Sequence, residues 1–153
     1  LLIGGKVTNA AMLLLGNSDF DYLFTAAPSI MWRLYGVDGT DKDYAIFKIP
    51  FINVVDKVFA KVRNLTYWYM PNQMTLFPME TEQYDSWLMR ELLNNSIAHS
   101  NYQLGGRIYV NEFDDKIKIT NPGDSELDEL TIFRRRSIFR CQTMIFHLVF
   151  KWT

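Results

Sequence analysis

The chain contains a single cysteine, Cys141, among its 153 residues. One thiol excludes an internal disulfide and leaves no cysteine cluster for zinc, so we expect a reducing, cytoplasmic setting. Two histidines without an acidic partner at a ligand spacing do not predict a zinc site either. The apolar run at residues 12–15 is far too short to span a membrane, and no signal peptide is visible at the start. We therefore expect no membrane partner.

The chain also lacks an excess of charge of either sign. Its net charge of −1 excludes a broad electrostatic attraction to nucleic acid, although it leaves room for a local basic patch. The 48% hydrophobic and 22% charged content is typical of a globular protein. The length allows one domain with a sizeable core, or two small lobes. Because the sequence begins LLIGG, without methionine, we expect a piece excised from a longer protein.

Glycine-rich and nucleophilic motifs are missing as well. Neither Gly4-Gly5 nor the pair Gly36 and Gly39 is followed by Gly-Lys-Ser/Thr, so the sequence has no phosphate loop and these glycines predict turns. No Ser-His-Asp or Cys-His arrangement is identifiable from the sequence.

Hydrophobic periodicity predicts an α+β domain, with a mixed or antiparallel sheet layered with helices. Turn residues bound the expected strands, which cover residues 10–15, 29–35, 66–70, 107–113 and 116–120. The expected helices cover residues 50–65, 84–99, 126–130 and 144–152, with an acidic start to the second at residues 80–83. Residues 1–75 are expected to form an N-terminal strand–helix lobe and residues 76–153 a helix-and-hairpin segment, with one continuous domain as the alternative.

Three polar side chains interrupt the apolar surface of the helix expected over residues 84–99. Glu91, Asn95 and His99 follow one another at i, i+4 spacing, so they form a polar stripe along one line of the helix surface. A carboxylate, a carboxamide and an imidazole on a mostly apolar helix need partners. Either neighbouring loops supply hydrogen bonds or the polar stripe faces a ligand. His99 equally fits the end of the helix, where positive charge is favourable.

Several stretches resemble a known family. ELLNNSIAHSNY at 91–102, GGRIYVNEFDDKIKITNPGD at 105–124, and TNAA with LLG between residues 8 and 16 resemble the carboxy-terminal half of bacterial ATP-dependent DNA helicase RecG-related proteins. Those proteins are transcriptional regulators that join a Schlafen-type, Alba-like DNA-binding domain to a divergent histidine-kinase-type ATPase domain. The resemblance covers roughly residues 6–124, with an echo at 139–142, and the chain departs from the pattern at Asn94, Ser96, Ser100 and Asn101. The helicase motor with its phosphate loop is not resembled, so helicase activity is not implied.

The resemblance implies the Bergerat-like ATPase fold shared by gyrase, heat-shock chaperones, histidine kinases and MutL. In that fold a helix carries Glu and Asn four residues apart, which would make Glu91 the catalytic group for the attacking water and Asn95 a ligand of magnesium. His99 would lie beside the magnesium site. Asn121 and Gly123 would take the place of the loop that grips adenine. The implied cofactors are therefore ATP and Mg²⁺, and the implied DNA-binding domain lies outside this chain.

The chain differs from those ATPases at the adenine loop and the lid. Asn121 stands where they have aspartate, and it offers both a donor and an acceptor to a base. The second glycine of their Asp-x-Gly-x-Gly loop is missing, and residues 125–153 contain no glycine from which to build a lid over the phosphates. The resemblance therefore implies nucleotide binding and leaves hydrolysis open.

Three functional hypotheses follow from the sequence. The first is a degenerate ATPase-fold module of a DNA-linked regulator that binds adenine nucleotide with magnesium. The second is a non-catalytic interaction or dimerisation domain that has lost nucleotide binding and forms a homo-oligomer. The third is direct DNA binding through the basic tail at residues 134–140, with Lys57 and Lys61, although such charges are more often a solvated surface.

Overall fold

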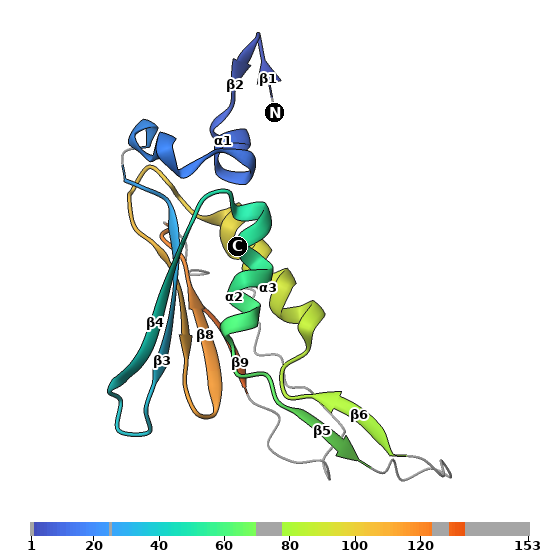
Figure 1. Cartoon of the computed structure of the whole chain (residues 1–153). Helices are drawn as coiled ribbons and strands as arrows, with labels where there is room; N and C mark the ends of the chain where they lie inside the picture. Colours follow the sequence, from blue (N-terminus) through green and yellow to red (C-terminus); the bar gives the residue numbers. More distant parts are fainter. Residues whose placement is uncertain (1, 25, 70–77, 124–128, 134–153) are drawn as a thin grey trace, which may run out of the picture.

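A five-stranded sheet forms the centre of the fold in the computed structural model, which describes residues 2–24, 26–69, 78–123 and 129–133 (Figure 1). The strands are β3 (Ser29–Tyr35), β4 (Asp41–Lys48), β7 (Ile108–Glu112), β8 (Lys116–Thr120) and β9 (Glu129–Phe133), in the order β4-β3-β7-β8-β9. β3 and β7 are parallel and the other neighbouring pairs are antiparallel. The predicted α+β class with a mixed sheet and helices is confirmed.

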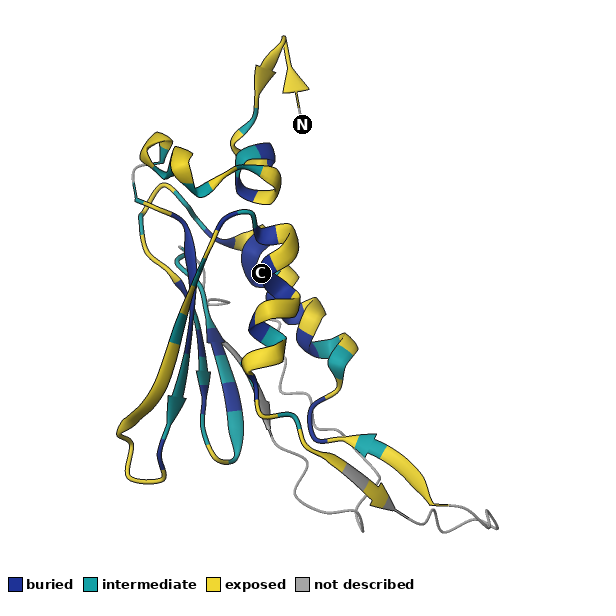
Figure 2. Ribbon diagram, viewed as in Figure 1, coloured by how far each residue is buried: buried dark blue, intermediate teal, exposed yellow. Residues whose placement is uncertain are grey.

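Two helices pack on one face of this sheet, where they bury an apolar core (Figure 2). α2 (Val54–Lys61) follows a short 3₁₀ turn, η2 (Phe51–Asn53), and contacts α3 (Ser86–His99). Alternation along β8 turns Ile117 and Ile119 into the core, as predicted for a strand with one wet face. The largest side chains that are fully buried in the apolar core are Trp32, Tyr84, Phe51, Ile30, Met89 and Leu93.

Smaller elements extend from both ends of this layered core. The ribbon of β1 (Leu2–Ile3) and β2 (Lys6–Val7) leads into α1 (Asn9–Leu15) and a 3₁₀ helix, η1 (Ser18–Leu23). At the other end, β5 (Thr66–Tyr69) pairs with β6 (Met79–Glu82) in an arm that projects away from the sheet (Figure 1). The central sheet takes strands from both sides of residue 75, because β3 pairs directly with β7.

The strand predicted over residues 10–15 is wrong, because this segment is the helix α1. The Thr8 side chain caps the helix by accepting a hydrogen bond of 3.2 Å from the backbone N–H of Ala11. Alanine, methionine and leucine are strong helix formers, and the segment has no β-branched residue. The strand was predicted because this apolar run is too short for an independent helix, but a capped, partly buried helix does not need to be stable alone.

The helix predicted over residues 50–65 is shorter than expected. Helical hydrogen bonding ends at Val62, whose N–H donates to the carbonyls of Val58 and Phe59. The next N–H, of Arg63, donates instead to the Glu112 carboxylate on β7, at 3.3 Å from Oε1. A buried carboxylate on the sheet thus draws the chain out of the helix.

Other predicted boundaries also changed. Residues 79–82 form strand β6 rather than an acidic helix start, and Asp85 instead caps α3 by accepting from Leu88 N–H at 2.9 Å. Glu129 and Leu130 belong to β9, so the short helix predicted over residues 126–130 is wrong there. Strand β4 was not predicted. The strands near residues 29–35, 66–70, 107–113 and 116–120 and the helix near 84–99 are confirmed.

Several expectations fall on residues that the structure does not describe. Cys141, the basic residues at 134–140 and the helix predicted over 144–152 lie outside the described ranges. Among the helices that are described, none has the length and apolar character needed to cross a membrane.

Candidate functional site

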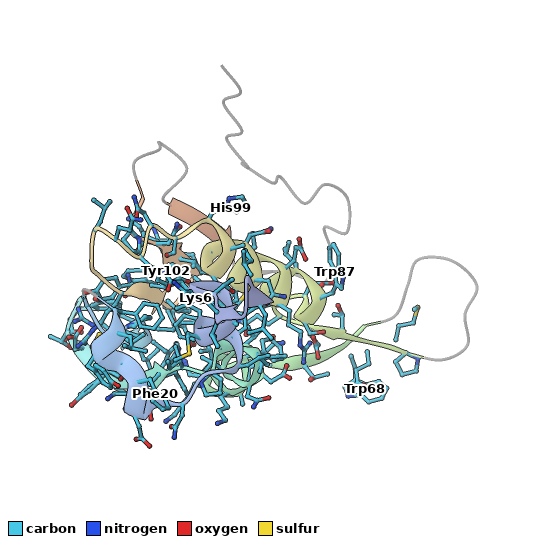
Figure 3. The ribbon with its side chains drawn as sticks, turned by 90° about the horizontal axis from the view of Figure 1, so that it is seen from above. Lys6, Phe20, Trp68, Trp87, His99 and Tyr102 are labelled. Atoms are coloured by element: carbon cyan, nitrogen blue, oxygen red, sulfur yellow. The ribbon has the colours of Figure 1, made fainter. Side chains whose placement is uncertain are left out.

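The polar stripe lies on the outward side of α3. The helix turns Met89, Leu93 and Ile97 into the core, and the i, i+4 spacing then places Glu91, Asn95 and His99 together on another side. Glu91 and His99 are exposed and Asn95 is half-buried. Figure 3 shows His99, with Trp87 from the first turn, projecting outward from the helix. The polar stripe is therefore open to solvent rather than sealed beneath neighbouring residues.

A hydrogen bond joins the first two members of the polar stripe. The Asn95 Nδ2 donates to Glu91 Oε1 at 3.2 Å. Since the amide nitrogen faces the carboxylate, the Asn95 Oδ1 points to the other side of the amide and keeps its acceptor lone pairs for another partner. The pair thus presents a carboxylate and a carboxamide oxygen one helical turn apart.

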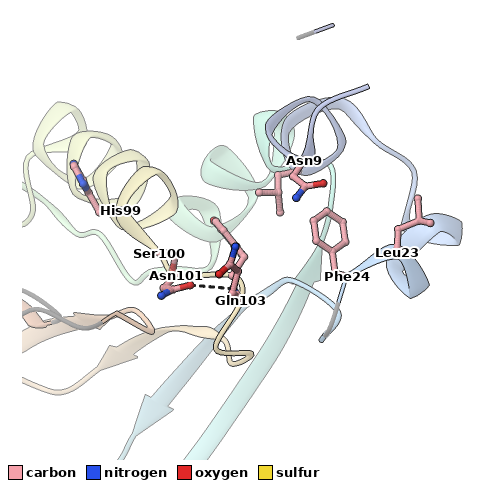
Figure 4. A pocket seen from close by; sticks show the side chains of 9 residues that line it. Asn9, Leu23, Phe24, His99, Ser100, Asn101 and Gln103 are labelled. Atoms are coloured by element: carbon pink, nitrogen blue, oxygen red, sulfur yellow. Dashed lines mark hydrogen bonds between the residues drawn. The ribbon is translucent and has the colours of Figure 1, made fainter. Parts of the chain in front are cut away.

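A cavity of about 560 Å³ opens beside the last member of the polar stripe (Figure 4). It lies between α1, the end of η1 and the chain that follows α3. The residues lining it are Asn9, Leu13, Leu23, Phe24, His99, Ser100, Asn101, Tyr102 and Gln103. Of the predicted site residues, only His99 lines this cavity; Glu91, Asn95, Asn121 and Gly123 do not.

The wall of the cavity combines apolar and carboxamide side chains. Leu13, Leu23 and Phe24 form its apolar part, while Asn9, Asn101 and Gln103 add groups that both donate and accept hydrogen bonds. The Asn101 Oδ1 accepts from the backbone N–H of Gln103 at 3.0 Å, which fixes its orientation (Figure 4). This mixture suits a flat, partly apolar ligand with polar edges.

Tyr102 anchors the chain below the cavity. Its hydroxyl donates to the carbonyl of Ile97 at 2.7 Å, in the last turn of α3. Burial raises the pKa of the Tyr102 phenol well above its ordinary value, and the nearby Ser100 hydroxyl opposes this only in part. The phenol therefore stays protonated and keeps its role as a donor to the helix end.

The loop predicted to hold adenine is tied to the same end of α3. The backbone N–H of Asn101 donates to the carbonyl of Pro122 at 2.6 Å, between Asn121 and Gly123. Gly106 has a φ of +135°, and a Cβ there would lie 3.3 Å from the Pro122 Cβ, so glycine suits this close approach. The structure thus brings residues 121–123 next to the end of the helix that carries the polar stripe, and all three residues are half-buried.

No preformed metal cage accompanies the polar stripe in the described ranges, which contain no group of three or more His, Cys, Asp or Glu side chains that could hold an ion. Magnesium does not require such a cage, because in nucleotide sites it is commonly held by one or two protein oxygens together with phosphates and water. The oxygens of Glu91 and Asn95 fit that chemistry.

The sequence pattern failed to identify most of the cavity lining. Asn9 lies just before residues 10–15, which were predicted as a strand, and Asn101 was noted only as a departure from a family pattern. Another missed residue is Glu112, whose buried carboxylate accepts hydrogen bonds from Trp32 Nε1 at 3.1 Å and Arg63 Nε at 2.7 Å. The alternation along β7 places Glu112 on the same buried face as Ile108 and Val110. A charged residue at such an inward position is the sequence signal that could have identified this buried carboxylate.

Comparison of the chain with protein-family models, with curated proteins and with solved structures finds no match. The resemblance to RecG-related regulators therefore stays a prediction that rests on the residues quoted for it. What the fold does establish is an α+β domain with a solvent-facing polar stripe, an adjoining cavity and a loop held against the same helix end.

Proposed function

We propose that this chain is a divergent Bergerat-like nucleotide-binding module of a DNA-linked transcriptional regulator, and that it binds adenine nucleotide with Mg²⁺. One observation carries the proposal. The polar stripe of α3 faces solvent, and the 121–123 loop is hydrogen-bonded to the end of that same helix through Asn101 and Pro122. The residues that the family resemblance assigns to metal and base thus lie on one helix and on a loop that is hydrogen-bonded to the end of that helix.

The two members of the hydrogen-bonded pair take different roles. Asn95 is the magnesium ligand, through the Oδ1 that its bond to Glu91 leaves available. Glu91 orients a water molecule with the carboxylate oxygen that does not accept from Asn95. Bound magnesium would supply positive charge that offsets the negative charge of the phosphates.

The remaining predicted residues contact the nucleotide further along the surface. His99 is the last member of the polar stripe, and its outward-facing ring N–H donates to a phosphate or ribose oxygen. Asn121 pairs with the edge of the adenine, and Gly123 lets the backbone approach the ring closely because it has no side chain.

Calorimetric titration with ATP and magnesium tests this function. The Asn95→Ala variant is expected to bind at least about tenfold more weakly, because a contact to a charged group contributes about 1.5–3 kcal/mol. Asn94→Ala is the matched control, since Asn94 is the same residue type, is exposed and lies off the polar stripe. Binding that is absent in the wild-type chain, or that falls equally in both variants, would reject the proposal.

A specific observation favours the second candidate, a non-catalytic interaction or dimerisation domain. The N-terminal elements expose large apolar side chains, among them Leu2 at 67%, Ile3 at 74%, Tyr22 at 75% and Leu23 at 60%. This candidate predicts concentration-dependent self-association in sedimentation velocity and no ATPase activity. Ile3→Ser should then weaken association, whereas Trp87→Ser, at a side chain of similar exposure on α3, should not.

A further inference from the structure

The cavity at the end of α3 has two sides, which come from distant parts of the chain. Asn9 and Phe24 line it from α1 and from the end of η1, whereas Asn101 and Gln103 line it from the chain that follows α3. Figure 4 shows the first two residues on one side of the space and the last two on the other. The volume of about 560 Å³ falls within the roughly 300–1,000 Å³ of small-molecule sites. Apart from His99, the residues assigned to the nucleotide do not line this cavity, so it is a candidate site of its own.

Aromatic and aliphatic side chains form much of the cavity wall. Phe24 and Tyr102 contribute rings, and both pack against the hydrophobic core, to which the lining residue Leu13 belongs. The Tyr102 hydroxyl donates to the carbonyl of Ile97 at 2.7 Å, so the polar end of this side chain is already occupied. Because the core holds these side chains in place, the apolar wall is preformed and offers a planar ligand a stacking surface.

The wall carries almost no charge. Among the nine described residues that line the cavity there is no aspartate, glutamate, lysine or arginine. His99 is the only one of the nine that can carry a positive charge, and its side chain projects outward from α3 (Figure 3). Burial raises the pKa of the Tyr102 phenol above its ordinary value, so this group adds no negative charge at neutral pH. An ion that entered the cavity would give up part of its hydration without gaining a counter-charge, which favours an uncharged ligand.

Three carboxamide side chains supply the polar part of the wall, namely those of Asn9, Asn101 and Gln103. Within the described part of the chain, the side chains of Asn9 and Gln103 form no hydrogen bond. A carboxamide carries an acceptor and two donors side by side, so it pairs with a ligand edge that carries a donor next to an acceptor. The cyclic amide of an oxopurine or an oxopyrimidine is such an edge, because its ring N–H lies beside its carbonyl oxygen.

We propose that this cavity binds an uncharged heterocycle with a cyclic-amide edge, such as an oxopurine base or its nucleoside. The ring lies against Phe24, and its polar edges bond to the carboxamides of Asn9 and Gln103. Since these two carboxamides come from opposite sides of the cavity, the bound heterocycle joins α1 to the chain that follows α3. This inference does not rest on the proposed function, because it requires neither magnesium nor phosphate.

Calorimetric titration of the full chain with hypoxanthine and with inosine tests the site, in buffer that contains EDTA and no ATP. Asn9→Ala should weaken binding about fivefold, the effect of losing one neutral hydrogen bond. Asn94→Ala is the matched control, because it makes the same substitution at an exposed helical position that does not line the cavity.

A second pair of variants tests stacking separately from hydrogen bonding. Phe24→Leu keeps an apolar side chain but removes the ring, and it should weaken binding about fivefold. Phe20→Leu removes a ring that is 44% exposed in η1 and does not line the cavity, so it should have no effect. Circular dichroism melting of all four variants checks that each is folded at the temperature of the titration.

Urate tests the requirement for an uncharged ligand, because it is a flat purine of similar size that is an anion at neutral pH. It should bind at least about tenfold more weakly than hypoxanthine, since the described lining has no lysine or arginine to compensate its charge.

The outcomes are distinct. Weaker binding in Asn9→Ala and Phe24→Leu, with both controls unchanged and urate the weakest ligand, supports the site; equal affinities for the two probes then assign the base alone, and tighter binding of inosine assigns the nucleoside. No saturable binding of either probe at millimolar concentration, equal losses in the variants and their controls, or urate binding as tight as that of hypoxanthine would overturn it. Because these titrations contain neither ATP nor magnesium, their result is independent of the test of the proposed function.

Discussion

Replacing the buried carboxylate of Glu112 should destabilise the fold strongly. The Glu112 side chain is 2% exposed and joins three parts of the chain, because it accepts from Trp32 Nε1 on β3 and from both the backbone N–H and the side chain of Arg63 after α2. Leucine is close to glutamate in volume, so the cavity that Glu112→Leu creates is small. The substitution leaves the buried indole N–H and the backbone N–H of Arg63 without acceptors.

The magnitude follows from these two unpaired donors. Each costs about 1–3 kcal/mol when left unsatisfied in the interior. The Arg63 side chain is 49% exposed, so it can turn to water, and its ion pair adds little. We therefore expect Glu112→Leu to lower the free energy of unfolding by about 3 kcal/mol. With a urea m-value of roughly 1.5 kcal/mol/M, the midpoint of unfolding should fall by about 2 M.

Urea titration followed by circular dichroism measures this loss. Glu91→Leu is the matched control, because it makes the same substitution at an exposed carboxylate and should cost less than about 0.5 kcal/mol. In the Glu112→Leu background, Trp32→Phe should cost about 1 kcal/mol less than it does alone, since the indole N–H has already lost its acceptor. A loss below about 1 kcal/mol for Glu112→Leu, or costs that simply add, would refute this explanation of the carboxylate.

Two further predictions concern the helix that carries the polar stripe. Asp85→Ala removes the cap bond of 2.9 Å to Leu88 N–H and should cost about 1 kcal/mol in urea unfolding, whereas Asp56→Ala, an exposed position on α2, should cost less; equal costs would contradict the capping role. For Tyr102, burial raises the pKa in the folded state above its unfolded value near 10. Unfolding therefore releases a proton once the pH exceeds about 10, so stability is fully present below that pH and is lost as the pH rises toward the folded pKa. Ultraviolet titration should show one tyrosine that ionises late, absent in Tyr102→Phe; if the late transition persists in that variant, the assignment is wrong.

The layered core was largely predictable because its signals are local. The alternation of β8 and the three- and four-residue spacing of α2 and α3 follow directly from burial of one face. The segment at α1 was not predictable from its length, because its stability comes from the Thr8 cap and from packing against distant residues. The end of α2 likewise depends on Glu112, which lies 49 residues further along the chain than Arg63.

The candidate site divides in the same way. The i, i+4 spacing of Glu91, Asn95 and His99 was sufficient to place the three side chains along one line of a helix. The cavity was not predictable, because it joins Asn9 of α1 to Gln103 beyond α3 through tertiary packing. The parallel pairing of β3 with β7 was not predictable either, since the two strands are far apart in sequence.

The most direct test of the nucleotide proposal is backbone NMR of the full chain titrated with ATP and magnesium. We predict saturable shifts of amide signals at residues 91–99 and 121–123, which are joined by the Asn101 to Pro122 hydrogen bond. In Asn95→Ala the same shifts should need at least about tenfold more nucleotide to reach saturation. Shifts confined to other surfaces, or no shift in either segment at millimolar nucleotide, would contradict the assignment of this helix and loop to nucleotide binding.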